Sequence, residues 1–501
     1  MKRFFFATVA ALAMALPAAA SEIRIAISKP PAYYDPRKAS DSMTWTVLSQ
    51  VYETPLLYTT ARPNGAPSLF SDVARVDNKT YVGTIVWGIV YSDGEALTAA
   101  QMIAWLSTVR DISSRATMTA GKKGTRETIT FHLKEPDQYF TQILMTNYCL
   151  VAKEKGKGVY LGTGPFVLGR HDDREIVLER NPHFHDAGEP KVDRLVFKVF
   201  PAAVDGTNPA LLDAIRRDEV DFTQAVPLSS LPQLQGVRTA KTLVLESKNT
   251  GWITFNFRRP GINDPKVRHA IAELLDPGDI VRRLYPVGTR AATSFLPPAL
   301  AAQVRGVDFD LHLKSDPAAA KRDLAAAGFG PEKKLNLTLL IAWASRPYCN
   351  NPVLFGELVK KQLEESGAIA VRVEQPASGD DYFRALLKAS FDLAGNGWIA
   401  DTPNPADFLE ANFASSKINC LSNCNNMAGW ADPKVDQAIR NLRATGAAAD
   451  FQTVVDEIRR ELPVFPIVHG PEVIVLSDRV HGIEPSTFSY VSFRTAFLGA
   501  P

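Results

Sequence analysis

The segment that decides the fold runs from Leu335 to Ile399 and opens with the largely apolar run Leu335-Asn-Leu-Thr-Leu-Leu-Ile341. Its pattern predicts strands and helices in alternation: strands at 335–341, 370–374 and 391–395, and helices at 352–366 and 380–389. Alternation of this kind is typical of a parallel sheet with right-handed crossovers. We therefore expect an α/β protein.

Strand and helix signals continue on both sides of that segment. Further strands are expected at 22–27, 175–179, 192–200 and 253–257. Thr98 is a good N-cap for a helix. Asp264 is expected to cap another helix, because Pro265 follows it at the first helical position, where the missing N–H of proline is harmless.

Two loops of the decisive segment should hold a ligand. In open parallel sheets, ligands bind beyond the carboxyl ends of the strands. The strand at 335–341 is followed by Trp343-Ala-Ser-Arg346-Pro-Tyr348-Cys-Asn350, and the strand at 391–395 is followed by Asn396-Gly397-Trp398-Ile-Ala-Asp401. Both loops should emerge at the same edge of the sheet. Together they offer one guanidinium, one carboxylate and three aromatic rings.

This set of side chains suits a peptide, which is a zwitterion. The ammonium of a peptide needs a carboxylate such as Asp401, and its terminal carboxylate suits a bidentate arginine such as Arg346. Trp398 can wall a pocket without selecting one side chain, and Gly397 lets the backbone approach a ligand closely.

A purely structural interpretation stands beside the ligand-binding one. Asp401 precedes Thr402-Pro403 and would then only form a turn through its own side chain. Arg346 would be a solvated surface residue, and Trp398 would belong to the core.

The N-terminus has the three parts of a cleaved secretory signal. Lys2 and Arg3 are positive, residues 4–16 form an apolar run too short to span a bilayer, and small residues follow Pro17. We expect residues 1–20 to be a signal peptide. Because no cysteine precedes Cys149, we expect a soluble periplasmic protein without a lipid anchor.

Charge and cysteines narrow the function further. The chain has 56 Lys and Arg against 54 Asp and Glu, so that loss of Lys2 and Arg3 leaves a neutral protein. Neutrality gives no argument for a nucleic-acid partner. Export permits disulfides among the four cysteines, Cys149, Cys349, Cys420 and Cys424, and three full pairings are open. A disulfide is favoured over a metal site, because no histidine lies near Cys420 and Cys424.

Five segments resemble family 5 extracellular solute-binding proteins of ABC importers, the group that includes the dipeptide- and oligopeptide-binding proteins. They are Val47–Leu57, Tyr91-Ser-Asp-Gly-Glu-Ala-Leu-Thr-Ala99, Gly162-Thr-Gly-Pro-Phe166 with Ile176–Pro182, Asn263-Asp-Pro-Lys-Val-Arg-His-Ala-Ile271, and Trp430-Ala-Asp-Pro-Lys-Val-Asp436. They follow the family's order along essentially the whole mature chain.

The resemblance implies a two-lobe periplasmic-binding-protein fold of type II, or cluster C, with the ligand enclosed between the lobes. Lobe one is then discontinuous, at 21–44, 161–258 and 476–501, and a subdomain at 45–160 is inserted in it. Lobe two is 259–475. The implied function is capture of a dipeptide or small oligopeptide by hinge closure, and its delivery to the membrane permease subunits of an ABC importer.

The resemblance also supports the two anchors. Gly397-Trp398-Ile-Ala-Asp401 is similar to the stretch whose aspartate holds a peptide's amino terminus, and Arg346-Pro347-Tyr348 is similar to a loop whose arginine holds the ligand carboxylate. The candidate ligand-binding residues are Asp401, Arg346, Trp398, Gly397, Asn396, Tyr348 and Trp45. We expect a monomer with no cofactor and no bound metal.

Two other functions stay open. Other members of the family carry metal chelates, opines or oligosaccharides, and His183-Phe-His185 is the one close histidine pair. We interpret that pair as structural, because it would leave most of a metal's coordination shell unfilled. A secreted hydrolase is the distant alternative, since the sequence has no Gly-x-Ser-x-Gly or His-Glu-x-x-His motif.

Overall fold

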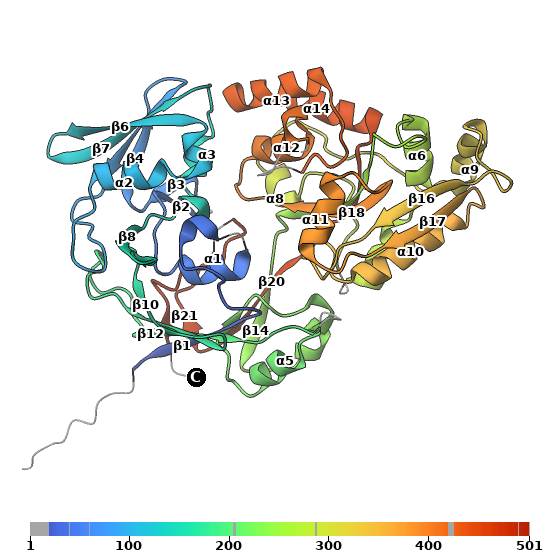
Figure 1. The fold of residues 1–501 in the computed structure, drawn as a ribbon. Coiled ribbons are helices and arrows are strands. Elements are labelled where there is room, and N and C mark those ends of the chain that lie inside the picture. Colours follow the sequence, from blue (N-terminus) through green and yellow to red (C-terminus); the bar gives the residue numbers. More distant parts are fainter. Residues whose placement is uncertain are drawn as a thin grey trace, which may run out of the picture.

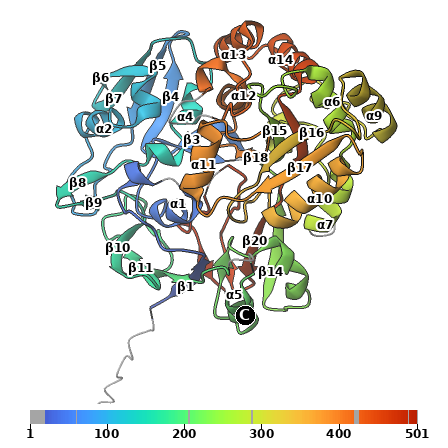
Figure 2. The same cartoon turned by 45° about the vertical axis from the view of Figure 1, so that its right-hand side comes forward.

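Two large sheets, one in each lobe, organise the chain (Figure 1). This computed structural model describes residues 20–39, 41–59, 61–203, 207–285, 288–418, 425–488 and 490–499. The first sheet lies at the lower end of the molecule in Figures 1 and 2. The elements of the expected subdomain and those of lobe two stand side by side above it (Figure 2).

The sheet of lobe one has seven strands in the order β10-β11-β12-β1-β13-β20-β14. Their bounds are β1 (Glu22–Ile27), β10 (Phe166–His171), β11 (Glu175–Arg180), β12 (Arg194–Val199), β13 (Phe222–Thr223), β14 (Ala240–Leu245) and β20 (Glu472–Ser477). β1 is parallel to both neighbours, and the other pairs are antiparallel. The strand expected at 22–27 is confirmed at those bounds. The helices α1 (Ser42–Leu48) and α5 (Pro209–Arg216) accompany this sheet.

The sheet of lobe two has five strands in the order β17-β16-β18-β15-β19. They are β15 (Asn249–Phe255), β16 (Leu335–Leu340), β17 (Ile369–Glu374), β18 (Leu393–Ile399) and β19 (Val464–Val468). β16 is parallel to β17 and to β18, as the alternating pattern predicts. The crossovers are α10 (Pro352–Glu364) and α11 (Gly379–Leu387), close to the expected helices. The α/β fold class is confirmed.

The chain crosses between the lobes earlier than we expected. β14 belongs to the first sheet, but β15 pairs with β18 and β19 in the second. Likewise β19 belongs to the second sheet and β20 to the first. The crossings are therefore at 246–248 and 469–471, not near 258 and 475. The strand pattern at 253–257 does not reveal which sheet the strand joins, since β15 is buried along its whole length.

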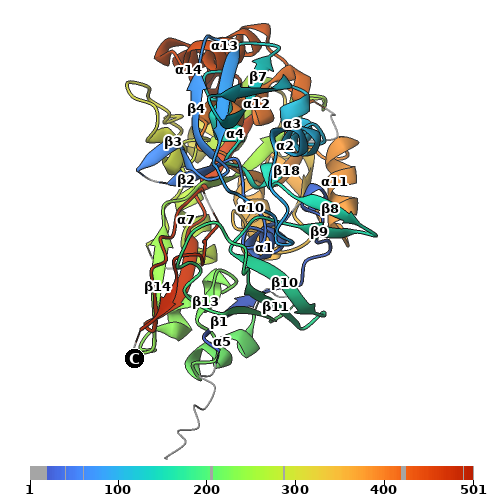
Figure 3. The same ribbon diagram turned by 90° about the vertical axis from the view of Figure 1, so that its left-hand side faces the viewer.

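A separate four-stranded sheet lies within the expected subdomain, in the order β4-β5-β7-β6. The elements of this region are β2 (Leu56–Thr59), β3 (Arg62–Pro67), β4 (Phe70–Arg75), β5 (Thr80–Ile85), α2 (Ala99–Leu106), α3 (Arg110–Ser113), β6 (Ala116–Lys123), β7 (Arg126–Leu133), α4 (Phe140–Ile143), β8 (Lys153–Gly156) and β9 (Val159–Leu161). Thr98 caps α2 as predicted, in a capping box with Gln101. Figure 3 shows β4 and β7 far above β10 and β11.

Each lobe has its own hydrophobic core. One cluster joins lobe one and the subdomain, and another fills lobe two. The remaining helices of lobe two are α6 (Pro265–Glu273), α7 (Pro277–Leu284), α8 (Pro298–Ala301), α9 (Pro317–Ala326), α12 (Pro405–Phe413), α13 (Pro433–Thr445) and α14 (Ala448–Glu461). Asp264 caps α6 and Pro265 opens it, as expected. The last short strands are β21 (Val480–His481) and β22 (Phe497–Leu498).

Two expectations fall wholly or partly outside the residues that the structure describes. The signal peptide at 1–20 lies outside the described residues except for its last position. Cys420 and Cys424 lie outside them as well, whereas Cys149 and Cys349 are buried free thiols. A disulfide that uses either buried cysteine is therefore not formed in this structure. Within the described ranges, no helix is both long and apolar enough to cross a membrane.

Candidate ligand-binding site

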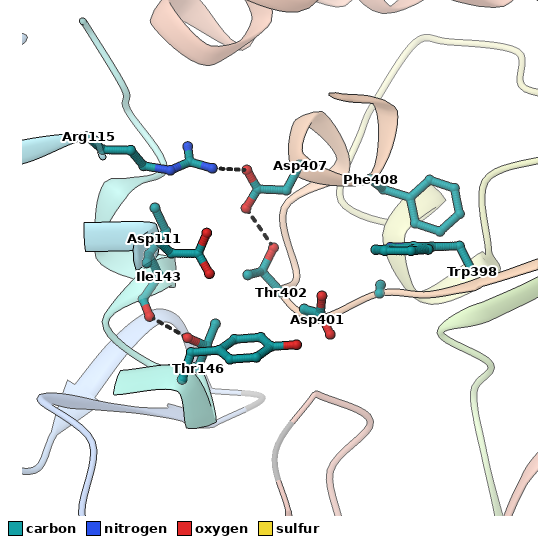
Figure 4. A pocket seen from close by; sticks show the side chains of 11 residues that line it. Asp111, Arg115, Ile143, Thr146, Trp398, Asp401, Thr402, Asp407 and Phe408 are labelled. Carbon is teal, nitrogen blue, oxygen red and sulfur yellow. Dashed lines mark hydrogen bonds and ion pairs between the residues drawn. The ribbon is translucent and has the colours of Figure 1, made fainter. Parts of the chain in front are cut away.

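A pocket lies between the subdomain and lobe two (Figure 4). The subdomain contributes Asp111, Arg115, Ile143, Thr146 and Tyr148, and lobe two contributes Trp398, Ala400, Asp401, Thr402, Asp407 and Phe408. The space between these side chains is about 470 Å³, part of it open to solvent. A molecule bound here would touch both sides at once.

Asp401 lies two residues beyond the end of β18, at the sheet edge where a ligand was expected. Its side chain is open to the pocket, and no described residue donates a hydrogen bond to its carboxylate. Desolvation between the lobes raises the pKa of Asp401 to about 7, while Lys248 opposes the rise and the charges of Asp111 and Asp407 add to it. A raised pKa means that the charged form of the carboxylate is disfavoured in the ligand-free protein. A cationic group of a ligand would stabilise that charged form.

The turn after Asp401 is held by other side chains. The Thr402 hydroxyl accepts a hydrogen bond from Asn404 N at 3.1 Å and donates one to Asp407 Oδ2 at 3.1 Å. Asn404 caps α12 by accepting from Ala406 N at 2.9 Å. Since these bonds fix the turn, the Asp401 side chain is not needed to form it.

Tyr148 stands on the subdomain wall beside Asp401. The negative charge of Asp401 raises the pKa of Tyr148, with burial and Asp111 adding to the effect, so the phenol stays neutral and can donate a hydrogen bond. Trp45 packs edge-on against Tyr148, with ring centroids 5.6 Å apart. Trp45 is only 5% exposed and is not among the pocket residues. In this structure it supports the wall from behind.

An ion-pair network joins the two walls. Asp407 pairs with Arg443 inside lobe two and with Arg115 of the subdomain, whose Nη2 lies 3.9 Å from Asp407 Oδ1. Asp137 of the subdomain lies 3.0 Å from Arg443 Nη1 and 3.3 Å from Arg115 Nη1. Burial would raise the pKa of Asp407, but the two guanidiniums lower it, so Asp407 is held as an anion. Its charge is already satisfied by the protein.

A second, smaller pocket takes two more of the candidate residues, Tyr348 and Asn396. Asn396 is 4% exposed and donates to Asn425 Oδ1 at 3.0 Å. A Cβ added at Gly397 would lie 2.7 Å from the Tyr348 ring, and one added at Gly251 would lie 2.3 Å from the Tyr348 carbonyl oxygen. In this structure Gly397 therefore makes room for the Tyr348 ring and for the carbonyl oxygen of Thr250, which would lie 2.5 Å from such a Cβ.

Arg346 lies outside the pocket that holds Asp401. Its guanidinium carbon stacks 4.1 Å from the centroid of the Trp343 ring. Its backbone bonds with Cys349 in both directions, at 2.8 and 2.9 Å. No carboxylate in the described part of the chain pairs with it. The structure thus brings Asp401 and Trp398 into one pocket, but it does not bring Arg346 there.

The residues on the subdomain side of the pocket were not predicted from the sequence. Asp111, Arg115 and Tyr148 come from the subdomain, whose contact with lobe two is long-range, and no local motif marks them. Only Asp407 could have been suspected from the sequence. Thr402-Pro-Asn-Pro405 predicts the start of a helix, and acidic residues favour the first helical turn.

The histidine pair has a structural environment. His185 Nε2 lies 3.0 Å from Glu53 Oε2, and Thr163 donates to the same oxygen at 2.7 Å. Among the described residues, no group of three or more His, Cys, Asp or Glu side chains could hold a metal ion.

Comparison with known proteins places the chain in a family. Residues 66–420 match the model of "Bacterial extracellular solute-binding proteins, family 5 Middle". A probable ABC transporter periplasmic-binding protein, SapA of Escherichia coli K12, is 24% identical over 75% of this chain and 69% of its own. The dipeptide-binding protein of Pseudoalteromonas sp. SM9913, crystallised with Met-Leu, has a TM-score of 0.80 at 19% identity and covers 95% of this chain and 100% of its own.

A third similar structure has a different ligand. NikA of Staphylococcus aureus, crystallised with Ni(L-His)2, has a TM-score of 0.75 at 15% identity and covers 95% of this chain and 99% of its own. Likeness at such identity shows the shared two-lobe fold and leaves the ligand open. The matched family model, which spans most of the chain, shows that this protein belongs to the family 5 bacterial extracellular solute-binding proteins.

Proposed function

We propose that this protein captures a short peptide between its lobes in the periplasm and delivers it to the permease subunits of an ABC importer. The observation that carries the proposal is Asp401, an unpaired carboxylate at the strand edge, inside a pocket that both lobes line. This carboxylate has no ion-pair partner among the described residues, and the terminal ammonium of a peptide would supply one. Trp398 and Phe408 provide apolar surface for the peptide without selecting one side chain.

Arg346 is the proposed partner of the peptide's carboxylate. Its guanidinium stacks on the Trp343 ring and interacts with the Tyr348 hydroxyl, and no carboxylate among the described residues pairs with it. To reach a ligand anchored at Asp401, the loop that carries Arg346 has to turn its guanidinium toward the pocket. A change of side-chain rotamer at a binding surface is common on ligand binding.

Closure about the two crossings would enclose the ligand. The crossings at 246–248 and 469–471 are short and lie side by side, with Lys248 Nζ 4.0 Å from Glu472 Oε2. Because each lobe has its own core, the lobes can move as bodies about this pair of segments. A peptide that contacts both lobes would shift the population toward the closed form, which the importer would recognise.

Thermal unfolding with a matched ligand panel tests the proposal. The mature protein is unfolded, freed of carried-over ligand and refolded, then mixed with Leu-Leu, N-acetyl-Leu-Leu, Leu-Leu-amide, agropinic acid or Ni(L-His)2. A ligand that binds only the folded state at a hundredfold excess over its dissociation constant adds about 2.7 kcal/mol of stability. We expect Leu-Leu to raise the unfolding midpoint and both blocked peptides to fail.

Two variants assign the effect to the pocket. Asp401→Asn should weaken Leu-Leu binding by about 10- to 100-fold, the worth of a charge-assisted hydrogen bond. Asp323→Asn, at an exposed carboxylate on the remote helix α9, is the control and should bind normally. If the opine or the nickel complex stabilises the protein and no peptide does, the peptide proposal is wrong and the family's other ligands take its place.

A further inference from the structure

Asp111 is a second carboxylate at the pocket that has no partner. It belongs to the short helix α3 of the subdomain, and Figure 4 shows its side chain on the wall that faces Asp401 and Asp407. Its neighbour Arg115 is engaged with Asp137 and Asp407. Within the described ranges, no residue forms an ion pair or a hydrogen bond with the Asp111 carboxylate.

The charges around the pocket do not balance. The carboxylates at and behind its wall are Asp111, Asp137, Asp401, Asp407 and Glu410, and the cations are Arg115, Lys417 and Arg443. Five carboxylates against three cations leave two carboxylates without a cation. Lys248 also acts on Asp401, but Glu472 is its own partner and the difference stays the same. The unpaired groups are Asp111 and Asp401, one from each wall.

Tyr148 lies near both of these carboxylates. The charges of Asp401 and of Asp111 both raise the pKa of Tyr148. Burial also raises the pKa of Asp111, although Arg115, Lys417 and Arg443 act against the rise. None of these three cations forms an ion pair with Asp111, because each is paired with another carboxylate.

We propose that the preferred ligand carries two cationic groups at its amino end: its α-ammonium at Asp401 and a basic side chain of its first residue at Asp111. This inference rests on the proposed function, since it specifies the peptide that the same pocket would take. A free amino terminus followed by the side chain of lysine, ornithine or arginine supplies the two missing charges. Such a ligand also ties the subdomain to lobe two through opposite ends of one residue.

Binding by isothermal titration calorimetry to three matched dipeptides tests the inference on the unmodified protein. The peptides are Lys-Leu, norleucyl-Leu and Nε-acetyl-Lys-Leu, which share an apolar stem and differ in the second charge. We expect Lys-Leu to bind at least about tenfold more tightly than the other two, because one charge-assisted contact is added. Equal affinities would overturn the inference while leaving the peptide proposal standing.

Asp111→Asn then locates the effect. It should reduce the preference for Lys-Leu over norleucyl-Leu to about one, mainly because Lys-Leu binds more weakly. If Asp111→Asn weakens both peptides equally, a single ammonium bridges the two carboxylates and the second cation is excluded. If none of the three peptides binds to the unmodified protein, the proposed function and this inference fall together. The unfolding midpoint of the ligand-free variant checks that it is folded.

Discussion

Asn249 and Gly470 exchange two hydrogen bonds, since Asn249 Nδ2 donates to Gly470 O and Gly470 N donates to Asn249 Oδ1, each over 3.0 Å. Asn249 follows the first crossing between the lobes, and Gly470 lies in the second. The pair therefore fastens the two crossings to each other. A residue with a side chain has no room at position 470, because a Cβ there would lie 2.1 Å from the carbonyl oxygen of Pro347.

Gly470→Ala should destabilise the protein. The added methyl group has to displace the backbone at Pro347 or break the bonds to Asn249, and overpacking of this kind costs about 1–3 kcal/mol. Chemical denaturation measures the loss. Gly330→Ala is the control, because nothing lies within 4 Å of a Cβ at that position. An equal response of the two variants would show that the contact at position 470 has no special weight.

Asp137→Asn should weaken closure. Asp137 of the subdomain pairs with Arg443 of lobe two at 3.0 Å, so that loss of its charge removes an attraction between the two walls. We expect a larger radius of gyration in small-angle scattering of the ligand-free variant. Ligand binding should be at least about fivefold weaker, because ~1 kcal/mol is the worth of an exposed pair and this pair is largely buried. Asp381→Asn removes an exposed pair within α11 and should change neither quantity. Unchanged scattering in Asp137→Asn would rule out this network as a closing device.

His185 should make stability depend on pH. Burial acts to lower the pKa of His185, but the hydrogen bond and the charge of Glu53 outweigh it, and the pKa is raised. The stabilisation is then complete below the unfolded value of about 6.5, and it is lost as pH rises through the higher folded value. The advantage of the unmodified protein over His185→Gln should therefore shrink from pH 6 toward pH 8. Unfolding midpoints across this range measure it, and the exposed His132→Gln is the control.

Asp401 should give peptide binding its own pH dependence. The pKa of Asp401 is about 7 without ligand, so below that pH the carboxyl has to lose a proton before it can accept an ammonium. Affinity should rise by up to roughly tenfold per pH unit below 7 and fall again above about 8, where the peptide's amino group loses its proton. Calorimetry in buffers of different ionisation heat detects the released proton. A pH-independent affinity below 7 would show that Asp401 is not the ammonium's partner.

Local signals predicted much of the fold. Each of these signals is contained in a short stretch of sequence. They are the helix caps at Thr98 and Asp264 and the alternation of strands and helices from 335 to 399, and the structure has them where expected. The sequence did not predict which sheet β15 joins, because a strand that is buried along its whole length can pair in either lobe.

The candidate site likewise has residues that the local sequence predicts and residues that it does not. Asp401 lies beyond the end of β18, at the sheet edge that the rule for parallel sheets indicates, and it lines the pocket. Trp398 was expected in the loop after a strand at 391–395, but β18 continues to Ile399 and includes it. Asp111 and Tyr148 meet them only because the subdomain folds against lobe two, and no spacing along the chain carries that information. The rule also favoured Arg346, but Arg346 stacks on Trp343 outside this pocket, and the order of residues along the chain does not predict that contact.

The place of β20 has a consequence for the order in which the protein can fold. β20 lies between β13 and β14, so these two strands have no partner on the side facing it until residues 472–477 are present. All strands of lobe two lie between residues 249 and 468 and can be complete before that. As the chain emerges from its N-terminus, the lobe that is begun first is therefore finished last. Until then it exposes open strand edges, which are a hazard for aggregation.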